Sequence, residues 1–296
     1  MNIGVFDSGS GGLTIMRRLE EVFPDRSFVY LGDHANIPYG SKSEEQIYAL
    51  VLTGLEHLFR ADCTLVIIAC NTAVARGLRR LQREWLPLFY PDRRVLGVIV
   101  PVVESLTGMP WLAEQLPLAR SPQARELTVG VFATQHTVAS GVFAGEIHKR
   151  APHIRVWQQA CPSLVPLLEA NASQVTLQVA VDKYAACLLE QLSGTRLDAC
   201  LLGCTHYPLL EACFRESLPV GVQLFSQPAI TAASLGAYLA RHPEFSTTHG
   251  SSRTFLTTGV PAVVSQLASK FYGRAVIFLS IEQAGSLTQG IVKKLG

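Results

Sequence analysis

The sequence predicts an α/β protein of parallel sheets that are covered by helices on both faces. Short apolar runs rich in β-branched residues, such as 3–7 and 64–69, alternate with longer segments of helical periodicity. These runs are apolar at nearly every position, as in parallel strands that are buried on both faces. With 48% hydrophobic and only 16% charged residues, a chain of 296 residues can also bury a sizeable core.

Taken in order along the chain, the elements support that class. We predict strands at 3–7, 27–31, 64–69, 95–99, 128–133, 153–157, 198–203, 222–225, 253–258 and 275–279. Helices are predicted between them, including 12–22, 43–60, 71–84 and 174–192. Because neighbouring parallel strands need a helical connection, this alternation predicts parallel pairing.

The chain also contains a weak internal duplication. DCTLVIIACNT at 62–72 resembles DACLLGCTH at 198–206, with Cys70 aligned to Cys204. In both segments an aspartate precedes an apolar strand, a small residue, a cysteine and polar residues that open a helix. Any two buried strands look alike, but the matched cysteines favour duplication. We therefore expect two similar α/β domains with a pseudo-twofold relation and an active site in the cleft between them.

Charge and cysteine usage limit the classes of partner. A formal net charge of +2, without a run of Lys or Arg, does not favour nucleic acid as a partner. The apolar stretches are too short to cross a membrane, and the opening MNIGVFDSG does not resemble a targeting segment. Seven scattered cysteines fit a reducing compartment. We expect a cytoplasmic protein with no nucleic-acid or membrane partner.

Two of the cysteines stand where α/β sheets bind ligands. Cys70 and Cys204 each follow a predicted strand, at the carboxyl edge of a sheet where a helix begins. A helix N-terminus favours thiolate over thiol. The residues after each cysteine suit a carboxylate ligand: Asn71 and Thr72 after the first, and Thr205 and His206 after the second. The other cysteines are expected only to pack in the core: Cys63, Cys161, Cys187, Cys200 and Cys213.

Three other kinds of site are less well supported. A single nucleophilic cysteine for acyl transfer leaves the second matched cysteine unexplained. Zinc at Cys204 and His206 lacks a CxxC pair or a second His cluster, so no metal is predicted. The glycines of DSGSGGL at 7–13 lack the GK[ST] ending of a phosphate loop. That segment better fits a tight turn at which a substrate carboxylate approaches the amides near Ser8.

A pair of opposed cysteines suits racemisation of an amino acid. The Cα proton is weakly acidic, so one base must remove it while an acid on the other face supplies a proton. A thiolate and a thiol exchange these roles when the reaction reverses. Each cysteine needs a partner that manages its proton, for which Asp7 and His206 are the candidates. An aspartate at a strand end is also a common helix cap.

Six segments resemble the bacterial glutamate racemases. They are FDSGSGGLT at 6–14, YLGDHANIPYGSKS at 30–43, IACNTA at 68–73, ACPSLVPLLE at 160–169, LLGCTHYPLL at 201–210 and FLTTG at 255–259. They follow the family's order and cover almost the whole chain. The resemblance implies an isomerase that interconverts L- and D-glutamate without a cofactor, neither pyridoxal phosphate nor metal. Such an enzyme supplies D-glutamate for peptidoglycan, and thus for cell-wall biogenesis and cell shape.

The resemblance also assigns roles to residues. Cys70 is the base toward D-glutamate, assisted by Asp7, and Cys204 is the base toward L-glutamate, assisted by His206. Substrate-binding positions carried over by the motifs are Ser8, Pro38, Tyr39, Gly40, Asn71, Thr72, Thr134, Glu169 and Thr205. Pro38 equally fits an ordinary turn proline, and Thr137 is an alternative to Thr134.

The family architecture implies an inserted domain. The first domain is expected at 1–97 and 226–296, with Asp7 and Cys70, and the second at 98–225, with Cys204 and His206. We expect a homodimer.

The chain departs from the family's usual sequence at three places. GDHAN stands where GDTAR or GDSAR is usual, which places His34 and Asn36 in that segment. The second departure is Val100 with Val102, and the third is the segment FSQPA at 225–229. These departures concern domain closure, dimer contacts and regulation more than the reaction.

Two other functions compete with glutamate racemisation: a related racemase activity and a regulatory role without catalysis. A two-cysteine racemase for aspartate or hydantoins is the nearest enzyme, but PYG at 38–40 and the GCTHYPLL run favour glutamate. A racemase-like regulator of a DNA-handling enzyme needs neither cysteine, whereas here both cysteines and their partners are intact.

Overall fold

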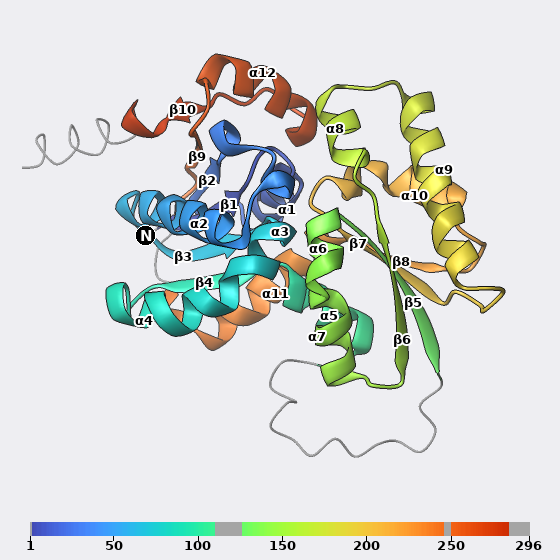
Figure 1. The fold of residues 1–296 in the computed structure, drawn as a ribbon. Coiled ribbons are helices and arrows are strands. Elements are labelled where there is room, and N and C mark those ends of the chain that lie inside the picture. Colours follow the sequence, from blue (N-terminus) through green and yellow to red (C-terminus); the bar gives the residue numbers. More distant parts are fainter. Residues whose placement is uncertain (1, 110–125, 246–249, 284–296) are drawn as a thin grey trace, which may run out of the picture. The chain divides into compact units, whose positions relative to one another are not determined.

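The computed structural model describes residues 2–109, 126–245 and 250–283 (Figure 1). Contacts within the chain divide it into two compact units. Unit 1 takes the described residues through Val98 and those from Thr231 onward, and unit 2 is Ile99–Ile230. Unit 1 is therefore built from both ends of the described chain.

Unit 1 contains a six-stranded sheet in the order β10-β9-β2-β1-β3-β4, and every pair of neighbours is parallel. Its strands are β1 (Asn2–Asp7), β2 (Phe28–Gly32), β3 (Cys63–Ile68), β4 (Arg94–Gly97), β9 (Arg253–Thr257) and β10 (Leu279–Ser280). Strands β1 and β2 are buried at nearly all positions. Two adjacent strands of this sheet, β1 and β3, carry the first set of candidate residues at their carboxyl ends.

The helices of unit 1 are α1 (Leu13–Val22), α2 (Glu44–Arg60), α3 (Asn71–Ala73), α4 (Leu86–Phe89), α12 (Pro261–Tyr272) and, shared with the end of unit 2, α11 (Gln227–Arg241). A capping box starts α2, because Ser43 accepts from the Gln46 amide while the Gln46 side chain accepts from the Ser43 amide. Between α3 and α4 the chain forms π-helical turns at Val74–Leu78 and Leu81–Trp85.

Unit 2 contains a four-stranded parallel sheet in the order β6-β5-β7-β8. The strands are β5 (Leu127–Ala133), β6 (Ile154–Ala160), β7 (Ala199–Gly203) and β8 (Gln223–Phe225). The helices are α5 (Ile99–Thr107), α6 (Gln135–Ser140), α7 (Val142–Arg150), α8 (Leu164–Glu169), α9 (Gln174–Gln191) and α10 (Glu211–Ser217). Helices α9 and α10 pack against each other over a core that includes Phe132, Leu188 and Phe214.

Four strands of the unit 1 sheet have the topology of the unit 2 sheet. The order β2-β1-β3-β4 in unit 1 has the same sequence of crossovers as β6-β5-β7-β8 in unit 2. In this arrangement the strand order reverses beside the first strand, and ligands of such sheets bind outside the carboxyl ends at that point. The point lies between β1 and β3 in unit 1, and between β5 and β7 in unit 2.

The predicted fold class is confirmed, and one predicted strand is largely wrong. The segment 275–279 forms a strand only from Leu279, because Ser269 and Ser265 of α12 accept hydrogen bonds from the amides of Val276 and Phe278. Those two amides therefore do not donate hydrogen bonds to a neighbouring strand. The predicted helix 71–84 also continues further than expected, to Phe89 at the end of α4.

Candidate active site

In unit 1, predicted site residues meet at the reversal point of the sheet. Asp7 ends β1, Ser8 follows it, and Cys70 lies two residues beyond the end of β3. The hydroxyl of Ser8 and the sulfur of Cys70 are 3.2 Å apart, within hydrogen-bonding distance for sulfur. Cys70 is 6% exposed and Asp7 is fully buried. The topology thus brings two segments 62 residues apart into one polar cluster.

The loop after β1 is held in place by its own contacts. The Gly9 amide donates to the Asp7 carboxylate at 2.7 Å, and the Tyr30 hydroxyl donates to the Gly9 carbonyl at 2.7 Å. A Cβ at Gly12 lies only 2.7 Å from the Asp7 Cβ, so glycine is required by this close approach. Burial raises the pKa of Tyr30, and the charges of Asp7 and Cys70 raise it further. Both ionisable groups therefore act on the same buried hydroxyl.

Cys70 also caps a helix, as the sequence predicts. It has extended backbone angles, and its carbonyl accepts the first helical hydrogen bond from the Val74 amide at 2.9 Å. Asn71 and Thr72 are buried in the first turn of that helix. Cys70 thus stands at a helix N-terminus, where the backbone amides carry a partial positive charge.

The PYG segment is attached to a buried carboxylate that sequence reasoning missed. Pro38 follows a cis peptide bond, and the Tyr39 hydroxyl donates to Asp33 at 2.8 Å. Thr258 and Asn36 donate to the other oxygen of Asp33, at 2.7 and 2.8 Å. Burial raises the pKa of Tyr39 far above its usual value, and Asp33 adds to the effect. The available signal was an acidic residue directly after a fully apolar strand.

Gly40 differs from Gly12 in its surroundings. No heavy atom lies within 4 Å of the position that a Cβ on Gly40 would take. The residue follows Tyr39 in a short 3₁₀ turn, Tyr39–Ser41. A predicted substrate-binding position therefore faces open space.

In unit 2, Cys204 is paired with a charged dyad. The Nδ1 atom of His206 lies 3.9 Å from the Cys204 sulfur, and its Nε2 atom lies 3.3 Å from the Glu169 carboxylate. Cys204 and His206 are buried, as is Thr205 between them. Glu169 ends α8 and is about one quarter exposed at its side chain, 26%. The sequence predicted all four residues.

The protonation of His206 follows from this geometry. Burial by itself lowers the pKa of the imidazole, but hydrogen bonds to Cys204 and Glu169 outweigh burial and raise the pKa to about 10. The ring is therefore cationic at neutral pH. This cation lies beside the Cys204 sulfur.

One expectation for Cys204 is wrong. The cysteine does not open a helix directly, because residues 204–206 form a turn closed by the Tyr207 amide donating to the Cys204 carbonyl at 3.1 Å. The first helical residues are a 3₁₀ turn at Tyr207–Leu210, with Pro208 in its first turn, followed by α10. The His206 cation, rather than a helix N-terminus, is the positive group beside this sulfur.

Thr134 directly follows β5, the strand that pairs with β7, and Thr137 lies in the first turn of the next helix, α6. Thr134 caps α6: its hydroxyl accepts from the Thr137 amide at 3.3 Å and donates to the Thr137 hydroxyl at 3.0 Å. Thr137 is fully buried, whereas Thr134 is partly exposed. Thr134 is the more accessible of the two, and its contact with substrate stays a prediction.

Four of the remaining cysteines have pKa values that burial raises. Burial raises the pKa of Cys200 to about 12 and also raises the pKa of Cys63, Cys161 and Cys213. A thiol kept neutral by burial is a poor base at neutral pH. Four of the five cysteines expected only to pack are therefore held as thiols.

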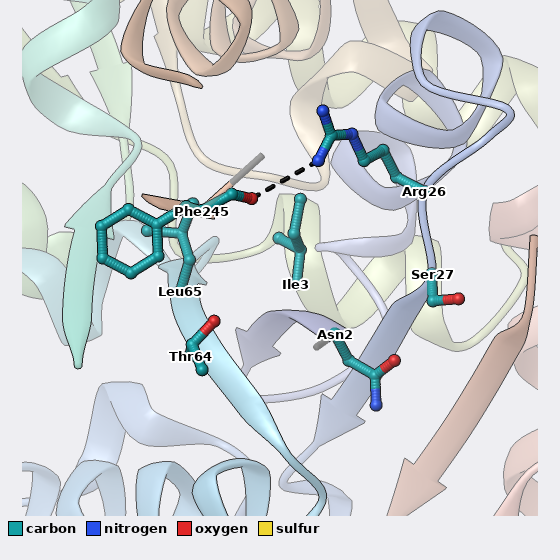
Figure 2. Close-up of a pocket in the computed structure, with 7 residues that line it drawn as sticks. All are labelled: Asn2, Ile3, Arg26, Ser27, Thr64, Leu65 and Phe245. Carbon is teal, nitrogen blue, oxygen red and sulfur yellow. Dashed lines mark hydrogen bonds between the residues drawn. The ribbon is translucent and has the colours of Figure 1, made fainter. Parts of the chain in front are cut away.

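The described part of the chain has neither a cluster of metal ligands nor a helix fit to cross a membrane. Residues 2–109, 126–245 and 250–283 contain no group of three or more His, Cys, Asp or Glu arranged to hold a metal ion. In the same part of the chain, no helix is both long and apolar enough to cross a membrane. Figure 2 shows a pocket of about 10 Å³ at the amino ends of β1 and β3, where Arg26 donates to the Phe245 carbonyl. It has room for about one water.

Comparison with known proteins identifies the family. The model of the Asp/Glu/Hydantoin racemase family matches residues 3–235. The chain belongs to the Asp/Glu/Hydantoin racemase family. It is 43% identical to the glutamate racemase of Phenylobacterium zucineum over 283 residues, covering 94% of this chain and 99% of that protein. It is 44% identical to the glutamate racemase of Caulobacter sp. over 283 residues, again covering 94% and 99%.

Solved structures of this racemase family agree in fold. Glutamate racemase RacE1 of Bacillus anthracis superposes with a TM-score of 0.78 at 27% identity, covering 94% of this chain and 96% of that one. The enzyme of Francisella tularensis, solved with D-glutamate, gives 0.76 at 27% identity, covering 95% and 98%. The resemblance drawn from the six sequence segments is confirmed, and the chain is a racemase.

Proposed function

We propose that this racemase interconverts L- and D-glutamate by a two-base proton transfer between Cys70 and Cys204. The observation that carries the proposal is that two sheets of one topology each hold a cysteine after the equivalent strand, each beside its own polar partners. The relatives named above are glutamate racemases, and one of the similar structures contains D-glutamate. We infer the same substrate for this chain.

The mechanism requires the two cysteines to approach Cα from opposite faces. We propose that 1–97 with 226–296 and 98–225 act as two domains that close on the substrate in this way. In the L-to-D direction, the Cys204 thiolate takes the Cα proton, forming an S–H bond as the C–H bond breaks. The Cys70 thiol then gives its proton to the other face of Cα and becomes a thiolate. The reverse reaction exchanges the two roles.

The surrounding groups hold the substrate and move protons to and from sulfur. We assign the protonation of Cys204 to His206, oriented by Glu169, and that of Cys70 to Asp7 acting with Ser8. Amides and hydroxyls at the strand ends hold the substrate carboxylates and the charge that develops at Cα. The residues assigned to binding are Ser8, Pro38, Tyr39, Gly40, Asn71, Thr72, Thr134, Glu169 and Thr205. The scheme uses no cofactor, and its product is D-glutamate for peptidoglycan in the cytoplasm.

The test is racemisation without any added cofactor. Purified protein is incubated separately with L-glutamate, D-glutamate and L-aspartate, and circular dichroism follows each solution. Both glutamate signals should decay to zero, while the aspartate signal persists. Decay of the aspartate signal alone would assign the chain to the other branch of the family.

A second measurement tests the two-base scheme itself. In deuterated water, D-glutamate formed from L-glutamate in a single turnover should carry solvent deuterium at Cα, because the proton delivered comes from a different sulfur than the one that received the original. Product that retains nearly all of its original hydrogen is the outcome expected of one base, and it contradicts the scheme.

A further inference from the structure

His34 connects three segments at the carboxyl edge of the unit 1 sheet. It begins a 3₁₀ turn, His34–Asn36, directly after β2 and Asp33. Its Nε2 atom lies 3.0 Å from the Ser10 hydroxyl, and its Nδ1 atom lies 3.0 Å from the Gly32 carbonyl and 2.9 Å from the Thr257 hydroxyl. The ring also meets Phe278 edge-on, with centroids 5.6 Å apart. No role was assigned to this residue from the sequence.

The partners determine which ring nitrogen carries the proton. The Gly32 carbonyl can only accept, so Nδ1 must be the donor. In the neutral tautomer that carries its proton on Nδ1, Nε2 is an acceptor for the Ser10 hydroxyl. Histidine can make both contacts because its two nitrogens lie on different edges of one rigid ring. The Thr or Ser that glutamate racemases usually carry here has a single hydroxyl close to the backbone.

The Ser10 contact completes the fixation of the loop that carries Ser8. Gly9 is held at both its amide and its carbonyl, by Asp7 and Tyr30. Ser10 is 1% exposed, and its hydroxyl is held by His34. Ser8 therefore lies in a segment anchored on both sides, and its own hydroxyl lies 3.2 Å from the Cys70 sulfur. A thiolate can only accept, so this hydroxyl donates whenever Cys70 is ionised.

We propose that His34 is a positioning residue that acts through Ser10 to hold the Ser8 hydroxyl against Cys70. The inference rests on the proposed function, in which Cys70 is one of the two bases. Loss of the His34–Ser10 contact frees the loop, weakens the hydrogen bond to the Cys70 thiolate, and lowers the fraction of Cys70 that is ionised at neutral pH. Cys204 belongs to unit 2, with partners of its own, and is unaffected.

The experiment compares His34→Asn, His34→Gln and Ser10→Ala. An Asn amide replaces the donor at Nδ1 and removes the acceptor for Ser10, whereas a Gln amide oxygen can replace that acceptor. Alkylation of Cys70 and Cys204 by iodoacetamide at pH 7 is timed by mass spectrometry of the two peptides. Alkylation at Cys70 should slow about three- to tenfold in His34→Asn and Ser10→Ala, as expected for one ordinary hydrogen bond. The rate should recover in His34→Gln and stay constant at Cys204 throughout.

A double variant separates positioning from general destabilisation. His34→Asn combined with Ser10→Ala should be no slower at Cys70 than either single change, because both remove the same contact. Multiplicative effects, equal slowing at Cys204, or an unchanged Cys70 rate would overturn the proposal. The alkylation readout does not require turnover, so it remains decisive if the chain fails to racemise glutamate. Racemisation kinetics then provide a second readout, in which kcat should fall while KM changes little.

Discussion

Cys70 and Cys204 hold equivalent positions in two sheets of the same topology, yet their surroundings differ in charge. Cys70 has a hydroxyl at 3.2 Å and lies at the N-terminus of a helix, close to a buried aspartate. Cys204 has an imidazole at 3.9 Å whose other nitrogen faces a carboxylate. One sulfur thus has a hydroxyl and a helix N-terminus as neighbours, and the other has an imidazolium.

The difference indicates that the repeated fold fixes where each proposed base stands but leaves its neighbouring groups different. Helix dipoles do not titrate, whereas an imidazolium loses its charge once the pH passes its pKa. A racemase needs two bases of nearly matched strength, because each must both accept and donate a proton. In the proposed scheme, the two units meet that requirement with different neighbouring groups.

The largest expected effect is the loss of either base. Cys70→Ala and Cys204→Ala should each lower kcat for glutamate racemisation by about a thousandfold or more, as expected when a positioned acid–base group is removed. Circular dichroism of glutamate solutions measures the rate. Cys187→Ala is the matched control, because Cys187 is a half-buried cysteine on α9 and should retain full activity. Near-normal turnover in either site variant would show that the two sulfurs are not the bases.

Removing the cation tests the contrast between the two sites. His206→Asn should lower kcat by roughly a hundredfold, because Cys204 loses the partner that stabilises its thiolate, within the range seen for acid–base groups. Iodoacetamide should then alkylate Cys204 more slowly at pH 7 while the rate at Cys70 stays the same. Equal slowing at both cysteines would mean that the change disturbs the whole fold instead.

The same histidine gives stability a defined pH dependence. Its pKa is raised in the folded protein, from 6.5 to about 10, so its contribution to the free energy of unfolding is complete below about pH 6.5 and is lost as the pH rises to about 10. The difference in urea midpoint between wild type and His206→Asn should therefore be largest near pH 6 and shrink steadily toward pH 10. A difference that grows with pH has the opposite sign and contradicts this assignment.

A milder change sharpens the comparison further. Glu169→Gln keeps the size of the side chain but removes the charge that faces His206 Nε2 at 3.3 Å. Since Glu169 helps to raise the pKa of His206, the alkaline limb of the pH–activity profile should move to lower pH, with only a severalfold loss of kcat at pH 7. Asp182→Asn is a control, since this exposed aspartate of α9 pairs instead with Ser217 and Gln178. An unmoved alkaline limb in Glu169→Gln would remove Glu169 from the scheme.

Much of this arrangement could be predicted from periodicity and strand ends. The buried parallel strands could be predicted because nearly all of their residues are apolar. Cys70 and Cys204 each follow one of these strands. The order of strands within each sheet could not be read from the sequence, because it depends on long-range pairing. The strand predicted at 275–279 failed because two serines of the preceding helix capture its amides, a competition that local pattern does not reveal.

Residues that act through other residues were the hardest to predict. Asp33 binds Tyr39, Asn36 and Thr258, and the contact with Thr258 joins two of the six family-like segments, 30–43 and 255–259. His34 was noted only as a departure from the family's usual residue. Their roles depend on hydrogen bonds to residues as far as 225 positions away, which only the fold brings together.

The smallest effects are expected from alanine substitutions at Gly12 and Gly40, two glycines that both lie in the family-like segments. Gly40 faces open space, so Gly40→Ala should leave the melting temperature unchanged and raise KM for glutamate only if substrate occupies that space. Gly12→Ala places a methyl group 2.7 Å from the Asp7 Cβ, so the loop must shift and alkylation of Cys70 should slow. Thermal melting and steady-state kinetics of the two variants measure both effects. A lower melting temperature for Gly40→Ala than for Gly12→Ala would show that the close approach of Gly12 to Asp7 does not hold the loop in place.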